Sequence, residues 1–238
     1  MHIRYDWQTA PLVLVAIMMS ACQPQVVRST NALRPFAVAM VASDTTDAFR
    51  YRVDTAASAV HILVYRAGAL ARLGHNHVVS SKDVTGAVYL NKELARSSVE
   101  IRLPVATLVV DDATARSQEG EAFAADVPSD AREGTRRNLL SAAVLDLEHY
   151  PTITLQSVAI AGTRSNPNLT MRITIKDVAR DVPLAVVVRK QGERIEASGE
   201  FEIKQSDFGI TPFSVALGAL QVQDRLRIRF SIVCTQQQ

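Results

Sequence analysis

The sequence is short of cysteine, aromatic residues, net charge and long apolar runs. Two cysteines among 238 residues cannot build a disulfide framework. Lysine and arginine total 26 against 24 aspartate and glutamate, and the resulting charge of +2 gives no basic surface for nucleic acid and no acidic block for storing cations. A mean hydropathy of +0.07 excludes several membrane-spanning segments of about 20 residues each.

Several motifs of enzymes are also missing. The chain has no glycine-rich phosphate loop, no G-x-S-x-G and no C-x-x-C. No local signature pairs a serine or cysteine with a histidine and an orienting acid, as nucleophilic catalysis requires. What remains is a globular composition, 47 % hydrophobic and 21 % charged. We expect a binding protein that is not an enzyme, with no resident cofactor and no nucleic-acid partner.

The N-terminal segment is typical of an export signal. Arg4 precedes an apolar run over residues 10–21, whose roughly 12 residues are too few to span a membrane but match the apolar core of a signal peptide. The run ends in Met19-Ser20-Ala21-Cys22, which resembles the lipobox of bacterial lipoproteins, where the cysteine becomes acylated, for example with palmitate. We predict a signal peptide over residues 1–21 and a lipidated Cys22. An ordinary cleaved signal with an incidental cysteine is the alternative.

The residues after Cys22 indicate where the protein is sorted. Gln23 follows the cysteine, and by resemblance to sorting in Gram-negative bacteria this favours the outer membrane, with the protein facing the periplasm. Residues 22–48 have little periodicity and predict a lipidated tether, which leaves 49–238 as one domain. Cys234 is expected to be a buried small apolar residue. A Cys22–Cys234 disulfide is an alternative that lipidation would exclude.

The domain alternates polar and apolar residues with a period of two. The pattern is clear over residues 98–103, 169–176 and 225–232, and it predicts antiparallel strands with one wet face. Further strands are expected at 59–66, 79–90, 152–162, 182–190 and 194–204. About eight antiparallel strands favour closure into a barrel, which removes exposed edges. Such a barrel is either filled by its own side chains or holds one small ligand, and composition does not decide between them.

One segment has helical periodicity. Residues 136–147 place leucine, alanine and valine on one stripe, which predicts a helix that covers a barrel opening or a sheet face. Its first two residues, Arg136 and Arg137, are a candidate site for an anionic head group, with a solvated helix face as the alternative. The preceding charged residues, 111–133, are expected to form a long surface excursion.

The order of motifs in this domain resembles the YceI-like family. The resemblance covers about residues 51–235. Its motifs are Tyr51-Arg52-Val53-Asp54, Ser58-Ala59-Val60, Gly86, Leu139-Leu140-Ser141, Tyr150-Pro151-Thr152 and Ser206-Asp207-Phe208-Gly209-Ile210. The resemblance implies a lipocalin-like eight-stranded barrel with a helical cover, located in the periplasm and often homodimeric. It also implies an isoprenoid or another long amphiphilic lipid in the interior.

A set of inward-facing residues is predicted to line this interior. Most are aliphatic, and His61 and Tyr65 are expected nearer a polar end. The predicted ligand-binding residues are His61, Tyr65, Val99, Ile101, Leu103, Leu155, Met171, Ile173, Ile175, Ile228 and Phe230.

The histidines leave further readings open. His75 and His77, in a Gly-His-Asn-His stretch that departs from the family pattern, would share one face of a strand. With His61 or His149 they would give three of the ligands that a metal or haem/redox site needs. The other interpretations are a polar gate that binds a lipid head group, and a purely structural role. An envelope scaffold with a packed barrel is the remaining alternative function.

Overall fold

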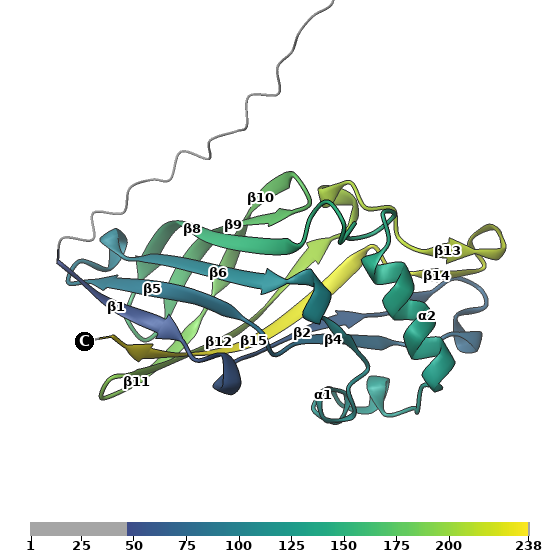
Figure 1. The fold of residues 1–238 in the computed structure, drawn as a ribbon, viewed down its shortest axis with the longest axis horizontal. Helices are drawn as coiled ribbons and strands as arrows, with labels where there is room; N and C mark the ends of the chain where they lie inside the picture. The colour runs from purple at the N-terminus through teal and green to yellow at the C-terminus, as the bar shows by residue number, and fades with distance from the viewer. Residues whose placement is uncertain (1–46, 238) are drawn as a thin grey trace, which may run out of the picture. The chain divides into compact units, whose positions relative to one another are not determined.

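The computed structural model describes residues 47–237, and it is an antiparallel β structure with few helices (Figure 1). The predicted signal peptide, Cys22 and the tether up to residue 46 lie outside the described residues. The described part contains β1 (Ala48–Val53), β2 (Ala59–Val64), β3 (Arg66–Ala67), β4 (His77–Ser81), β5 (Thr85–Asn91), β6 (Ser98–Pro104), β7 (Val109–Val110), α1 (Ala113–Ser117), α2 (Ser129–Leu140), β8 (Thr152–Gly162), β9 (Pro167–Ile175), β10 (Val178–Ala185), β11 (Val187–Gln191), β12 (Arg194–Lys204), β13 (Ser214–Val215), β14 (Leu220–Val222) and β15 (Arg225–Gln236).

The large sheet closes into a ring. Strands β1, β5, β6, β8, β9 and β10 pair in that order, and β1 pairs with β15, β15 with β12 and β12 with β11. The ring closes through β10 and β11, which follow one another in the chain and are separated by a bend at Val186. After β10, the N–H groups of Val186 and Val188 donate to the carbonyls of Pro167 and Ser165, at 3.1 and 2.8 Å, before β11 joins β12. Closure satisfies the edges that an open sheet would leave unpaired.

A branch leaves the ring at β15. Residues 234–236 of β15 pair with β1, while residues 227–231 pair with β2, which continues into β4 and β7. The break between β1 and β2 is set by Asp54, whose carboxylate accepts hydrogen bonds from the N–H groups of Ala56 and Ala57. Ser58 donates its hydroxyl to the Asp54 carbonyl at 2.7 Å, which fixes the turn.

The antiparallel all-β prediction is confirmed, but the strand count is larger than the predicted eight. The predicted strand over 79–90 is two strands, β4 and β5, because Lys82 and Asp83 form a turn. The strand over 182–190 bends into β10 and β11. The remaining strands are β1 and β7 of the large sheet and a separate three-stranded sheet, β13-β14-β3.

The helical cover is shifted from its predicted position. The helix is α2, over Ser129–Leu140, and not residues 136–147. The chain leaves the helix at Ser141, and Asp146 has a left-handed backbone conformation with φ of 49°. Leu139, Leu140, Val144 and Leu147 still pack against the core, so the apolar pattern was read correctly although half of it lies in turns.

Residues 111–133 are more than a surface excursion. Phe123 and Ala115 pack on the outer face of the β2–β4 branch, where they bury Leu63 and Val78 in a second, smaller core. Asp111 is also buried, with 1 % of its surface exposed. This segment therefore clamps the branch from outside.

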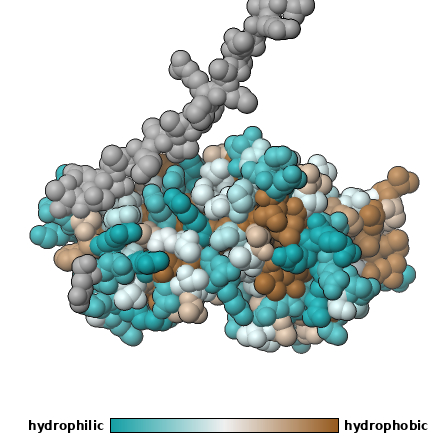
Figure 2. All heavy atoms as spheres, in the orientation of Figure 1, coloured by the Kyte–Doolittle hydropathy of each residue, from teal (hydrophilic) through white to brown (hydrophobic). Residues whose placement is uncertain are grey.

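The small sheet presents exposed apolar side chains. Figure 2 shows apolar residues gathered over β13 and β14, and Phe213, Val215 and Leu217 are the exposed large hydrophobic residues there. No helix among residues 47–237 is long and apolar enough to span a bilayer.

Candidate ligand cavity

The barrel encloses a cavity of about 520 Å³ with an apolar wall. Every strand of the ring contributes side chains to this wall. Nine of the predicted interior residues lie on the wall, namely Val99, Ile101, Leu103, Leu155, Met171, Ile173, Ile175, Ile228 and Phe230. The period-two pattern placed these residues correctly on the wall, because every second side chain along a strand of the ring faces inward. Further wall residues that sequence reasoning missed include Tyr51, Val60 and Ile62.

His61 and Tyr65 do not line the cavity, so their predicted placement is wrong. They alternate along β2 with Val60 and Ile62, which face the cavity, and therefore point to the outer face. His61 Nδ1 lies 2.6 Å from Oε1 of Glu119, and the Tyr65 ring meets Phe123 edge-on with centroids 5.3 Å apart. His61 and Tyr65 therefore attach the segment of residues 111–133 to the outer face of the β2–β4 branch, through Glu119 and Phe123.

The polar residues of the wall gather at one end of the barrel. They are Asn91, Lys92, Ser97, Arg164, Lys190 and Gln236, and each lies beside the end of a strand. Antiparallel order brings the start of β1 and β6 and the end of β5, β8, β11 and β15 together here. Because Lys92, Arg164 and Lys190 are exposed, we call this end the mouth. No aspartate or glutamate of the described residues lines the cavity.

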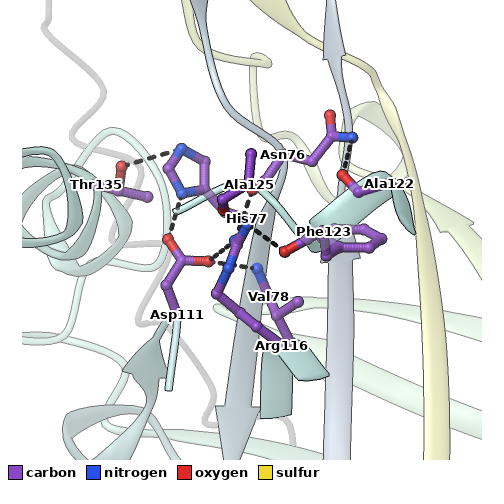
Figure 3. A network of polar contacts seen from close by, with 9 residues as sticks. All are labelled: Asn76, His77, Val78, Asp111, Arg116, Ala122, Phe123, Ala125 and Thr135. Carbon is purple, nitrogen blue, oxygen red and sulfur yellow. Dashed lines mark hydrogen bonds and ion pairs between the residues drawn. The ribbon is translucent and has the colours of Figure 1, made fainter. Parts of the chain in front are cut away.

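A buried polar network holds the opposite end (Figure 3). Asp111 Oδ2 accepts from Nδ1 of His77 at 2.6 Å, and its Oδ1 accepts from Arg116 at 2.6 Å and from the N–H of Val78 at 2.9 Å. Burial on its own would raise the pKa of Asp111, but the hydrogen bonds from His77 and Val78, the charge of His77 and the Arg116 bond together lower it. Nε2 of His77 lies 3.4 Å from the hydroxyl of Thr135 on α2.

Arg116 extends this network into the neighbouring loops. Its Nη1 donates to the carbonyl of Asn76 at 2.9 Å, and its Nη2 donates to the carbonyls of Phe123 and Ala125, both at 2.6 Å. The network thus joins β4, α1, α2 and the loop between the helices. Its geometry is that of a structural clamp, in which each buried donor has an acceptor.

The histidines do not assemble into a metal site. His77 faces the same side of the β2–β4 pair as Val64, whereas His61 faces the other side with Leu63. His149 is exposed and pairs with Asp146, which raises the pKa of His149 through a hydrogen bond and charge. Among residues 47–237 no three histidine, cysteine, aspartate or glutamate side chains are placed to hold a metal ion.

The Gly-His-Asn-His stretch is not a gate to the cavity either. His75 and His77 are absent from the wall and lie near α2, at the end opposite the mouth. Arg136, on the same helix, donates to the carbonyl of Ala106 at 2.8 Å, and Arg137 is exposed beside Glu133. These head-group candidates therefore lie off the cavity wall, at the end of the barrel opposite the mouth.

We compared the chain with models of known protein families. The model of the YceI-like domain matches residues 51–234. The chain belongs to the YceI-like family. The match begins within β1 and ends within β15, and it includes the motif residues Tyr51 and Gly86 on neighbouring strands. Comparison with curated proteins gives no match.

The chain is similar to proteins of known structure. The structure of Burkholderia cenocepacia BcnA is 22 % identical, with a TM-score of 0.57, and the alignment covers 77 % of this chain and 99 % of that one. A Campylobacter jejuni YCEI protein is 14 % identical with a TM-score of 0.47, over 66 % of this chain and 82 % of that one. At 22 % identity the likeness to BcnA concerns the fold alone.

Proposed function

We propose that this YceI-like protein is a lipid-anchored carrier that holds an isoprenoid or another long-chain amphiphile inside its barrel, facing the periplasm. The observation that carries the proposal is the apolar cavity of about 520 Å³. Its volume falls in the range of small-molecule sites, roughly 300–1,000 Å³. Water gains few hydrogen bonds in an apolar cavity, so an apolar chain is the favoured occupant.

The shape of the wall suits a single extended chain. Along β9 the wall runs from Pro167 to Ile175, a span of about 26 Å at about 3.3 Å per residue. Burying apolar surface contributes about 25 cal/mol per Å², so a long chain along this path is held without directional contacts. This supports binding rather than catalysis, since the wall along β9 consists of Pro167, Leu169, Met171, Ile173 and Ile175, which offer no acid, base or nucleophile.

The anchor is proposed to be Cys22. Several acyl chains on one residue hold a protein firmly at a membrane. Within the described part, the chain enters the barrel through Asp47 and Ala48, at the mouth end. A lipidated Cys22 would tether the protein to the periplasmic face of the outer membrane. Homodimerisation, which the family resemblance implies, stays a prediction.

Native mass spectrometry of the full chain, purified in mild detergent, tests the carrier function. We expect a copurified apolar ligand in the wild type. The Ala197→Phe variant, which fills the cavity from β12, should lose it, whereas Ala161→Phe on the outer face of β8 should retain it. A wild-type protein that binds no lipid, even when lipids are added, would refute the carrier and favour an envelope scaffold.

A further inference from the structure

The mouth of the cavity concentrates positive charge. Lys92, Arg164 and Lys190 reach the wall from three different turns or strand ends. None of the three forms an ion pair with a carboxylate among residues 47–237. Glu93, the acidic neighbour in the same turn as Lys92, pairs with Arg96 at 3.0 Å, and Glu193 lies off the wall. The apolar cavity therefore ends in a positively charged rim.

The two lysines belong to the inward register of their strands. Val88, Leu90 and Lys92 alternate along β5 and its end, and all three line the cavity. Val186, just before β11, and Val188 and Lys190 within it do the same. Each inward row thus changes from apolar to cationic at the level of the mouth. A long-chain amphiphile has the same change of polarity, from its chain to its head.

Arg164 is held beside these lysines by backbone contacts. Its Nη2 donates to the carbonyl of Asn91 at 3.0 Å and also to that of Lys92. The next residue, Ser165, accepts from the N–H of Val188, two residues before Lys190, at 2.8 Å. The arginine therefore links the turn after β5 to the neighbourhood of β11. The remaining guanidinium donors form no hydrogen bond with the described residues.

We propose that the mouth selects amphiphiles with an anionic head group, a carboxylate or a phosphate, bound by Lys92, Arg164 and Lys190. This inference rests on the proposed carrier function and names the chemical class of its ligand. Charge-assisted hydrogen bonds from ammonium and guanidinium groups to carboxylate or phosphate are stronger than neutral ones. Lys190 donates to the carbonyl of Gly192 at 2.6 Å, but none of the three cations has a carboxylate partner among the described residues. Such a rim gives a neutral head group no comparable gain.

The test compares anionic and neutral probes on the full chain after its copurified lipid has been removed. One pair is palmitate and hexadecanol, and the other is geranylgeranyl phosphate and geranylgeraniol, so that carboxylate and phosphate are tested separately. We expect each anion to bind at least about tenfold more tightly than its neutral partner at low salt. Raising the ionic strength should weaken only the anions, because salt screens exposed charges.

The Lys92→Gln/Lys190→Gln variant isolates the rim charge and leaves the backbone contacts of Arg164 in place. We expect its Kd for the anionic probes to rise about tenfold and its Kd for the neutral probes to stay unchanged. The matched control is Lys82→Gln/Lys204→Gln, two exposed lysines that lie off the wall, and it should behave as the wild type.

Two results would overturn the inference, and they are distinguishable. If anionic and neutral probes bind equally well, without salt dependence and without an effect of the rim variant, the head-group selection is wrong and the carrier function stands. If none of the four probes binds, the carrier function fails, and the selection fails with it.

Discussion

The carboxylate of Asp111 lies between His77 and Arg116, 2.6 Å from a nitrogen of each. Asp111 is buried, and its backbone φ of 56° is a conformation that asparagine tolerates well. Asp111→Asn therefore removes the charge without adding backbone strain. Because it leaves two buried donors without their anion, we expect the free energy of unfolding to fall by about 3 kcal/mol, measured by urea denaturation. The exposed Asp126→Asn serves as control and should change stability by less than about 0.5 kcal/mol.

The same carboxylate predicts how stability depends on pH. The folded pKa of Asp111 lies below its ordinary value of 3.8. The ionised group therefore contributes stability above pH 3.8, and this contribution is lost as the pH falls through the lower, folded value. The difference in unfolding free energy between wild type and Asp111→Asn should shrink as the pH falls below 3.8. A difference that grows on acidification would contradict the clamp.

His61 is expected to matter for stability and not for ligand binding. It faces away from the cavity and pairs with Glu119, whose other carboxylate oxygen lies 2.7 Å from Arg229. His61→Ala should leave the copurified lipid at its wild-type occupancy in native mass spectrometry, while the midpoint of thermal unfolding falls. Loss of the lipid with an unchanged midpoint would contradict this and would indicate that His61 contacts the ligand.

Gly86 is expected to tolerate no side chain. Its φ is +150°, and a Cβ atom there would lie 2.0 Å from the carbonyl oxygen of Glu100 on β6. Gly86→Ala must push β5 and β6 apart, so we expect a loss of about 2 kcal/mol or more in urea unfolding. Gly192→Ala is a useful comparison, because its φ is also positive, at +58°, but its Cβ would meet nothing within 4 Å. An equal loss in both variants would assign the effect to backbone strain alone.

Cys22 and Cys234 are expected to differ completely in chemistry. Cys22→Ser should remove the acyl mass of the mature protein and release it from the membrane fraction, both measurable after expression in a Gram-negative host. Cys234→Ala should keep the acyl mass, since Cys234 is buried and burial raises the pKa of its thiol to about 11. A membrane-bound Cys22→Ser protein of unchanged mass would contradict the lipoprotein prediction.

The sequence predicted the barrel wall well because one physical rule governs it. Inward and outward residues alternate along every ring strand, so Ile101, Met171 and Ile173 could be placed on the wall from polarity alone. The same rule misplaced His61, because the odd-numbered residues of β2 were assigned to the inner face, whereas Val60 and Ile62 face the cavity. Its neighbours Leu63 and Tyr65 are apolar, yet they pack against the outer clamp segment and not against the main core.

The rest depended on contacts between distant residues, which no local pattern encodes. The role of His77 required Asp111, which lies 34 positions further along the chain. The rim required three cations from separate turns or strand ends. Its one local signal was a lysine at the end of an inward apolar row, as in Val88, Leu90 and Lys92. That signal becomes meaningful only when the strand order is known, because the order shows that Lys92 at the end of β5 and Lys190 near the end of β11 lie at the same end of the barrel.

The last strand of the chain, β15, is bonded to β1, β2 and β12. The first strands of the domain therefore have no permanent partner on that side until the final residues have been synthesised. Contacts of such long sequence separation make folding slow. The ring can therefore close only once β15 is complete, and we expect the domain to fold more slowly than one built from local hairpins.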